Sequence, residues 1–337
     1  MMKAVGSTRP LPVTDPAALI DLELPKPKAS GRDLLVRVMA VSVNPVDVKM
    51  RAWTTPPEGQ PLILGYDAAG LVEAVGKDVT LFKPGDAVFY AGTKFRPGTN
   101  AEYHLVDERI VGKKPASLDF TAAAALPLTS LTAWELLFDR LEVVPGKRVG
   151  GTLLIVGAAG GVGSILIQLA RRLTGLTVIA TASRPETRDW CLSLGAHHVI
   201  DHRRPLHEEL KKAGLPQPNL VTSLNHTGEH FPAIVEALAP QGKLALIDDP
   251  DLFDVRLLKP KAASLHWESM FARALFETPD MIAQHRILND VAALVDDGVL
   301  RTTLTQPMGR IDAATLLRAH AAVESGTSRG KIVLTGF

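Results

Sequence analysis

The pattern of apolar and polar residues divides the chain into three zones. Residues 1–125 contain short β-type runs interrupted by proline and glycine, such as Leu34–Val38 and Gly70–Val75. A Pro-Gly-Asp turn at residues 84–86 precedes another such run, Ala87–Tyr90. Short strands at this spacing predict a small, mostly antiparallel, barrel-like domain.

Residues 126–265 follow a different pattern, in which apolar runs alternate with helix-forming segments. Because short connections join the alternating strands and helices, this pattern predicts a parallel sheet covered on both faces. The predicted strands are Leu153–Val156, Thr177–Thr181, His198–Ile200, Leu220–Ser223 and Lys243–Ile247. The predicted helices include Ser164–Leu173, Pro185–Leu194 and Phe231–Leu238.

The parallel-sheet pattern stops in the last zone, residues 266–337. A helix is predicted over Asp280–Asp296, and the chain closes with the β-like run Lys331–Leu334. We therefore expect residues 1–125 and 266–337 to form one domain and residues 126–265 to form the other.

The first strand of the central zone runs directly into a glycine-rich segment. Gly160 and Gly161 would let backbone N–H groups approach a pyrophosphate, and Gly163 would let the next helix lie close to the strand. The positive end of that helix would face the phosphates. Ala158 stands where the strict pattern has its first glycine. The segment predicts a dinucleotide site formed by Ala159, Gly160, Gly161, Val162 and Gly163.

The end of the second predicted strand bears on the choice of dinucleotide. NAD-selective folds place an acidic residue there for the ribose 2′-hydroxyl, whereas this strand ends in Ser183 and Arg184. An arginine binds a 2′-phosphate bidentately, so the sequence favours NADPH; the alternative makes Arg184 a solvated helix-cap residue. Arg188 and His202 are secondary candidates for the same phosphate, with surface roles as their alternative.

Composition narrows the class of protein. With 337 residues the chain can form two domains, and 46% hydrophobic with 22% charged residues is the balance of a soluble globular protein. A formal net charge of +1 provides no basic field for nucleic acid or a membrane surface. No apolar run is long enough for a membrane span or a secretory signal. The single cysteine, Cys191, excludes an intramolecular disulfide and suits the cytoplasm.

Seven motifs follow one another along the chain, at residues 42–47, 65–70, 79–86, 128–135, 157–163, 194–202 and 265–271. Together they resemble the medium-chain dehydrogenase/reductase superfamily over essentially the whole chain. The chain is most similar to the zinc-free quinone-reductase branch, with its zeta-crystallin-like relatives, and to a bacterial zinc-type alcohol dehydrogenase-like subgroup. The resemblance implies an α/β protein with a GroES-like, mostly-β catalytic domain and a Rossmann domain with a doubly wound parallel sheet. It also implies a homodimer or homotetramer that acts on a small molecule.

The related zinc enzymes indicate where a metal would bind. The corresponding positions here are Asn44, Tyr66 and the stretch Leu126–Leu128, none of which offers a normal zinc ligand. A structural zinc would need a four-cysteine lobe, which a single cysteine excludes. We therefore expect no bound metal, although a zinc-type alcohol dehydrogenase is retained as the alternative enzyme.

Two pairs of histidines do not change this expectation. His197 and His198 are adjacent on a predicted strand, so their side chains point to opposite faces. His226 and His230 have a helical spacing, but the stretch containing them is predicted to be a loop after the fourth strand. Neither pair predicts a metal site.

Without zinc, an alcohol lacks the Lewis acid that lowers its pKa. A quinone or an enone can accept hydride directly from NADPH, provided that a hydrogen-bond donor stabilises the oxygen that gains charge. Asn44 and Tyr66 are the candidate catalytic donors; the alternatives are a turn cap for Asn44 and a packed aromatic with a satisfied hydroxyl for Tyr66. The expected activity is therefore reduction of quinones or activated enones. An NADPH-binding sensor or structural protein with little turnover is the alternative from another class.

The remaining candidates are cofactor contacts and pocket walls. Thr129 resembles a family position near the nicotinamide, and two residues follow the carboxyl ends of predicted strands, where Rossmann ligands bind: Asn225 and Asp248. Three aromatic residues are candidate pocket walls, with a core or loop-tip role as the alternative: Trp53, Trp267 and Phe271. Asp47 and Asp67 are expected to be structural.

Overall fold

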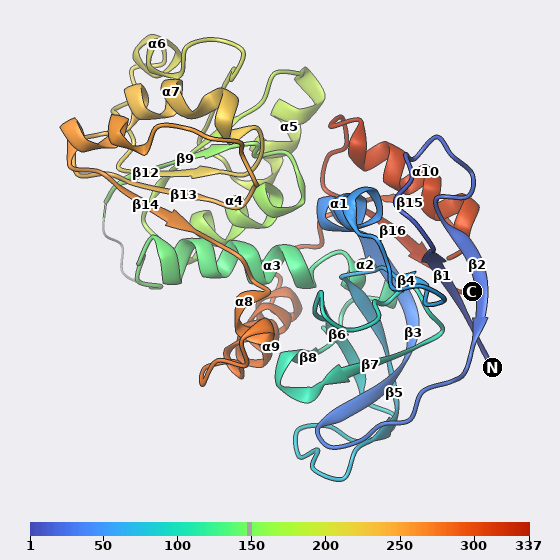
Figure 1. The fold of residues 1–337 in the computed structure, drawn as a ribbon. Coiled ribbons are helices and arrows are strands. Elements are labelled where there is room, and N and C mark those ends of the chain that lie inside the picture. The colour runs from blue at the N-terminus through green and yellow to red at the C-terminus, as the bar shows by residue number, and fades with distance from the viewer. Residues whose placement is uncertain (147–149) are drawn as a thin grey trace. The chain divides into compact units, whose positions relative to one another are not determined.

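The computed structural model describes residues 1–146 and 150–337, which form two compact units (Figure 1). The first unit contains Met1–Leu131 and Phe271–Phe337, and the second contains Thr132–Met270. These boundaries lie a few residues beyond the positions expected from the sequence. No helix in the described part of the chain has the length and apolar character needed to cross a membrane.

The first unit is built mainly from antiparallel strands. Its strands are β1 (Met2–Ser7), β2 (Ile20–Leu24), β3 (Asp33–Val43), β4 (Leu62–Ile63), β5 (Ala68–Val75), β6 (Ala87–Tyr90), β7 (Tyr103–Asp107), β8 (Val111–Lys113), β15 (Leu304–Pro307) and β16 (Lys331–Thr335). The larger sheet has the order β15-β16-β3-β5-β6-β8, with β7 also paired to β3, and the smaller sheet has the order β2-β1-β4. The long strand β3 pairs with β5, β7 and β16, so it forms the centre of the unit.

Helices pack against these strands. They are α1 (Pro45–Trp53), α2 (Phe120–Ala124), α3 (Pro127–Trp134), α8 (Ala272–Leu275), α9 (Ala283–Asp296) and α10 (Ala313–Glu324), with the 3₁₀ turn η1 (Glu108–Ile110). α1 begins in a capping box, because Asp47 accepts a hydrogen bond from the Asn44 backbone N–H and Pro45 occupies the first helical position. α10 begins where Asp312 accepts from the Thr315 N–H.

The second unit is a parallel sheet with helices on both faces. Its strands are β9 (Thr152–Val156), β10 (Thr177–Thr181), β11 (His198–Ile200), β12 (Leu220–Ser223), β13 (Lys243–Leu246) and β14 (Ser264–Trp267). Their order is β11-β10-β9-β12-β13-β14 with every neighbour parallel. Counted within the unit this is 3-2-1-4-5-6, the doubly wound order, with its switch point between β9 and β12. The predicted fold class is confirmed.

The helices of this unit explain why its strands are continuous apolar runs. They are α4 (Gly161–Leu173), α5 (Pro185–Leu194), α6 (Leu206–Lys212) and α7 (Thr227–Ala237), together with the π-helical turn η2 (Glu135–Arg140) and the 3₁₀ segment η3 (Val255–Lys261). Figure 1 shows α6 and α7 on one face of the sheet and α4 on the other. Leu154 and Val156 pack with Phe231 and Ile234 of α7, and every residue of β9 is buried. A strand covered on both faces needs no polar alternation.

Two sequence predictions are wrong in this unit. The stretch after β12 is not a loop, because α7 begins at Thr227 and includes His230. The Asp248 side chain supplies the acceptor at the start of that helix. The parallel sheet also extends beyond β13, since β14 forms its sixth strand among the described residues. As an edge strand, β14 is only partly buried and lacks the apolar run typical of a central strand.

Candidate functional site

The glycine segment lies at the switch point of the parallel sheet. Gly157 follows β9 with φ +80°, and Gly160 is the residue preceding α4. A Cβ at Gly163 would lie 2.3 Å from the Ala158 carbonyl oxygen, so only glycine lets α4 pack this closely on the turn. The residue with left-handed backbone is thus Gly157, one position before Ala158. The turn therefore has a glycine at the position whose conformation requires one. The motif is Gly157-x-x-Gly160-x-x-Gly163.

The N-terminus of α4 is suited to an anion. Among the described residues, no side chain caps α4 at Gly160, and a Cβ built on Gly160 would have no neighbour closer than 3.6 Å, so the space beside it is open. The first N–H groups of a helix have no partner within the helix, and its dipole favours negative charge there. Ala159, Gly161 and Val162 are partly exposed around this end.

The two residues placed after β12 and β13 have different surroundings. Asn225 is exposed, and its Oδ1 lies 2.4 Å from the position of a Cβ on Gly157, so its amide lies directly beside the turn. Asp248 instead accepts hydrogen bonds from the Thr227 N–H (2.8 Å) and the Thr227 hydroxyl. Its carboxylate therefore caps α7, and this contact supports a structural role.

The three basic candidates after β10 and β11 also have different surroundings. Arg184 is partly exposed beside Ser183, and its Nε lies 3.3 Å from the Glu186 carboxylate. Arg188 donates from Nη1 to the Val199 carbonyl (2.7 Å), which ties α5 to β11. His202 packs edge-on against His230, with ring centroids 5.7 Å apart, and burial lowers the pKa of both imidazoles. Of the two arginines, Arg188 is the more exposed, whereas Arg184 stands nearer the end of β10, at the residue that precedes α5.

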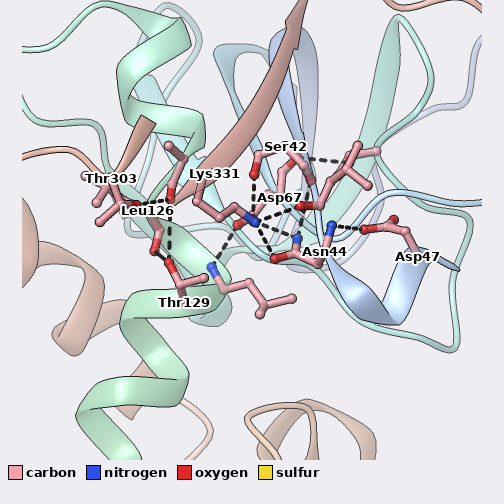
Figure 2. A network of polar contacts seen from close by, with 12 residues as sticks. Ser42, Asn44, Asp47, Asp67, Leu126, Thr129, Thr303 and Lys331 are labelled. Atoms are coloured by element: carbon pink, nitrogen blue, oxygen red, sulfur yellow. Dashed lines mark hydrogen bonds and ion pairs between the residues drawn. The ribbon is translucent and has the colours of Figure 1, made fainter. Parts of the chain in front are cut away.

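In the first unit, Asn44 is at the centre of a buried polar network (Figure 2). The residue is 1% exposed. Its Nδ2 donates to Asp67 Oδ2 (2.8 Å) and to the Ser42 carbonyl (3.3 Å), while its Oδ1 accepts from Lys331 Nζ. The orientation of the amide follows from chemistry, because an ammonium only donates and a carboxylate only accepts. Both N–H bonds of Asn44 are thus used inside the protein.

Lys331 and Asp67 form the charged part of this network. Lys331 Nζ donates to the Val43 carbonyl (3.0 Å), Asp67 Oδ2 (3.1 Å) and Asn44 Oδ1, which uses all three ammonium protons. Asp67 also accepts from the Leu128 N–H at Oδ1 (2.7 Å) and from the Ser42 hydroxyl (3.3 Å).

Burial and hydrogen bonding have opposite effects on the pKa values of Asp67 and Lys331. Burial raises the pKa of Asp67 and lowers that of Lys331, whereas the hydrogen bonds favour both charged forms. Because the groups around the Asp67 carboxylate are donors, we assign the pair as ionised. The sequence contains no signal for this pairing, since the partners are 264 residues apart.

Tyr66 precedes Asp67 and differs from Asn44 in the hydrogen bonding of its polar atom. The residue is 1% exposed, and its ring packs edge-on against Phe271 at 5.6 Å between centroids. Burial raises the pKa of its phenol, which is therefore protonated at neutral pH. Among residues 1–146 and 150–337, no group hydrogen-bonds the Tyr66 hydroxyl. That hydroxyl is a donor without an internal acceptor.

Of the remaining candidates, two are buried and two are exposed. Thr129 is buried, and its hydroxyl donates to the Leu126 carbonyl (3.1 Å) in the first turn of α3. Phe271 is buried against Tyr66, with Lys94 Nζ 4.8 Å from its ring centroid. Trp53 is 71% exposed at the end of α1, and Trp267 is 54% exposed on β14. Neither tryptophan is a core residue.

The residues at the position of the family's catalytic metal do not fit zinc. In the part of the chain that the structure describes, no group of three His, Cys, Asp or Glu side chains could hold a metal ion. Asn44 has both ends of its amide occupied, and the carboxylate that this amide contacts, Asp67, is already paired with a cation. A second cation would be repelled by Lys331.

Comparison with known proteins gives the family. Residues 30–116 match the alcohol dehydrogenase GroES-like domain, and residues 194–334 match the zinc-binding dehydrogenase family. A zinc-type alcohol dehydrogenase-like protein of Staphylococcus aureus is 40% identical over 99% of both chains. The chain belongs to the medium-chain dehydrogenase/reductase superfamily. Within this superfamily it falls in the zinc-type alcohol dehydrogenase-like subgroup, and it is an oxidoreductase of that type.

Two further relatives have names that state a chemistry. The human mitochondrial NAD(P)H oxidoreductase RTN4IP1 is 30% identical over 90% of this chain and 81% of its own length. A 2-methylene-furan-3-one reductase of Solanum lycopersicum is 38% identical over 55% of this chain and 48% of its own.

Solved structures of this superfamily share the fold over the full length. A protein of Rhizobium etli assigned as a zinc-dependent alcohol dehydrogenase has 61% identity and a TM-score of 0.95 over 100% of this chain and 98% of its own. A quinone oxidoreductase of Pseudomonas syringae has 25% identity and a TM-score of 0.83, over 99% and 100%. A mycobacterial protein complexed with NADPH has 26% identity and the same TM-score over the same shares.

Proposed function

We propose that this chain is an NADPH-dependent reductase that acts without a metal on a quinone or an activated enone. The observation that carries the proposal is the Asn44–Asp67–Lys331 network, in which the amide of Asn44, a position that the family resemblance assigns to a zinc ligand, is bonded to a carboxylate and an ammonium. The named chemistry of the relatives supports it: an NAD(P)H oxidoreductase, an enone reductase and a quinone oxidoreductase. An already electron-poor acceptor needs no Lewis acid to take a hydride.

For the cofactor, we propose that the α4 N-terminus holds the pyrophosphate and that Asn225 lies beside it. The contacting backbone belongs to Ala159, Gly160, Gly161, Val162 and Gly163, whose placement leaves this helix end open. We propose that Ser183 and Arg184 hold the 2′-phosphate, with His202 nearby. The NADPH complex of the mycobacterial relative supports this choice. We propose that Thr129 lies near the nicotinamide. We propose that the Asp248 carboxylate caps the start of α7.

NADPH, when bound, supplies the hydride. The Tyr66 hydroxyl then donates a hydrogen bond to the substrate oxygen as that oxygen gains negative charge. Its raised pKa keeps the proton on Tyr66 before reaction, and either Tyr66 or water delivers a proton to the reduced product. Asn44 cannot polarise the carbonyl in the observed arrangement, because both of its N–H bonds point inward. Phe271, which packs on Tyr66, is proposed as a pocket wall together with Trp53 and Trp267.

We further propose a homodimer in the cytoplasm. Among the described residues, β14 is an edge strand paired only with β13; its Trp267 is 54% exposed, and Leu252 and Leu257 close by in the chain are also exposed. An exposed edge with apolar side chains is a site at which a second copy can pair. Sedimentation of the purified protein tests this directly, and a monomer would contradict it.

The test of the activity is loss of NADPH absorbance on addition of an ortho-quinone or an enone. The protein is first treated with a chelator, and NADH serves as the parallel cofactor. Rapid oxidation of NADPH but not NADH supports the proposal. Activity with an alcohol and NADP⁺ that requires added zinc would contradict it. Tight NADPH binding without turnover of either acceptor class would favour the sensor or structural protein instead.

A further inference from the structure

Lys331 stands out among the buried charges because three separate elements surround it. It begins β16, the last strand of the chain, and is 3% exposed. Its three acceptors are the Val43 carbonyl at the end of β3, the Asn44 amide before α1 and the Asp67 carboxylate before β5. Figure 2 shows the side chain running between these groups. No sequence motif marks this residue.

Asp67 connects Lys331 to the residues that we propose to act in the reaction. It is the residue after Tyr66, so fixing its side chain on both sides also fixes the backbone that carries the Tyr66 ring. Its Oδ1 accepts the Leu128 N–H in the first turn of α3, one residue before Thr129. The ion pair therefore connects the Tyr66 backbone, the Asn44 amide and the start of α3.

A second set of hydrogen bonds reaches the same turn from β16. The Lys331 backbone N–H donates to the Thr303 carbonyl (2.9 Å), and the Thr303 hydroxyl donates to the Ala125 carbonyl (3.1 Å). The Thr129 hydroxyl closes this turn on Leu126. The first residue of β16 is thus linked by its backbone, through Thr303, to the Ala125 carbonyl just before α3. Its side chain contacts the Asp67 carboxylate, which accepts the Leu128 N–H (Figure 2).

We propose that Lys331 is a positioning residue of the reaction, which orients Tyr66 and the first turn of α3 through Asp67 and Asn44. The inference rests on the proposed function, because it assigns Tyr66 as the donor. The physical reason is charge balance in a buried site. Without the ammonium, the Asp67 carboxylate has no counter-charge and the Asn44 Oδ1 has no donor, so the amide is free to rotate and the carboxylate takes up a proton.

The experiment compares Lys331→Met, Lys331→Arg and the double variant Lys331→Met/Asp67→Asn with Lys83→Met. The control removes a lysine from an exposed ion pair, in which the Lys83 side chain is 81% exposed. For each protein we measure kcat and KM with the acceptor, the Kd of NADPH, the unfolding midpoint, and hydrogen exchange at the Leu128 amide. Exchange at the Leu238 amide, which donates to the Ile234 carbonyl at the end of α7 in the second unit, is the internal reference.

We expect kcat of Lys331→Met to fall by at least about tenfold, while the Kd of NADPH changes by less than about twofold. Exchange at Leu128 is expected to rise relative to Leu238. Lys331→Arg retains the charge and is expected to keep more activity than Lys331→Met. The double variant removes the uncompensated charge, so it recovers stability, yet its kcat stays low because nothing orients the amide.

A double variant with parental stability and parental kcat would overturn the inference. If neither methionine variant folds, Lys331→Arg decides, because a guanidinium cannot place its donors on the same three acceptors; a parental kcat in that variant would count against positioning. A parent without activity on either acceptor class is a failure of the proposed function alone. The inference is then read from hydrogen exchange, and unchanged Leu128 protection in Lys331→Met would overturn it.

Discussion

In the proposed function, the two units prepare for a charged ligand or transition state by opposite physical means. The glycine turn after β9 uses backbone N–H groups and the helix dipole, and it contains no charged side chain. The Asn44 network uses a buried ion pair, and all three of its central side chains are at most 3% exposed. The first arrangement depends on the absence of side-chain atoms, whereas the second depends on every polar atom having its partner. Substitutions should therefore damage them in different ways.

The largest effect is expected at the glycine turn. Gly163→Val places side-chain atoms on the Ala158 backbone, where even a Cβ would lie at 2.3 Å. We expect a loss of about 3 kcal/mol or more in the free energy of unfolding, together with loss of NADPH binding. Denaturant unfolding and a fluorescence titration with NADPH measure the two quantities.

Gly160→Ala is the matched control, because its new Cβ has no protein neighbour closer than 3.6 Å. It should leave the fold intact and weaken NADPH binding, since the methyl group points into the space proposed for the pyrophosphate. Equal losses of stability in the two variants would contradict the distinction between them.

The next effect concerns Tyr66 against Asn44. Tyr66→Phe removes the donor without changing the ring that packs on Phe271. We expect kcat to fall by about a hundredfold, the usual effect of removing one such donor, with NADPH affinity unchanged. Steady-state kinetics and the unfolding midpoint are the measurements.

Asn44→Ala should instead lower stability more than it lowers kcat. Because Asn44 satisfies Asp67 and Lys331, its removal should lower stability by about 1–3 kcal/mol and reduce kcat only as far as the site relaxes. If Asn44→Ala lost the most activity at full stability, Asn44 and not Tyr66 would be the donor.

The third prediction concerns pH. Burial raises the pKa of Asp47 to about 7, against 3.8 as its ordinary value. The unfolded chain therefore releases this proton first, so the contribution of Asp47 to stability is present below about pH 4 and is lost as pH rises to about 7. Asp47→Asn should remove this slope, an effect of at most a few kcal/mol. Denaturant unfolding at pH 4.5, 6 and 7.5 gives the difference between parent and variant, and parallel curves would refute the assignment.

The smallest effect is expected at the ribose. Arg184→Ala should weaken NADPH binding by about tenfold and leave NADH binding unchanged, because only NADPH carries the 2′-phosphate. Arg188→Ala is the control, since its guanidinium already bonds the Val199 carbonyl. Equal losses with both cofactors for Arg184→Ala would exclude a contact to the phosphate.

Local signals predicted much of the second unit. The bounds of β10, β11, β12 and α5 match the predicted ranges, because apolar runs, a proline at the first helical position and Gly195 at the helix end are all short-range features. The start of α7 was missed because its acceptor, Asp248, follows a different strand. β14 was missed because an edge strand does not need to be apolar on both faces.

By itself the sequence determined the position of the glycine turn, the doubly wound sheet and the absence of zinc-type ligands at Asn44 and Tyr66. Each of these is a property of a contiguous segment or of a residue type. Only the tertiary structure decided which way the Asn44 amide points and that Tyr66 alone of the two retains a donor. That decision depends on Lys331, which comes to Asp67 across 264 residues through the pairing of β16 with β3. The partner of a buried charge is set by packing in three dimensions and not by spacing along the chain.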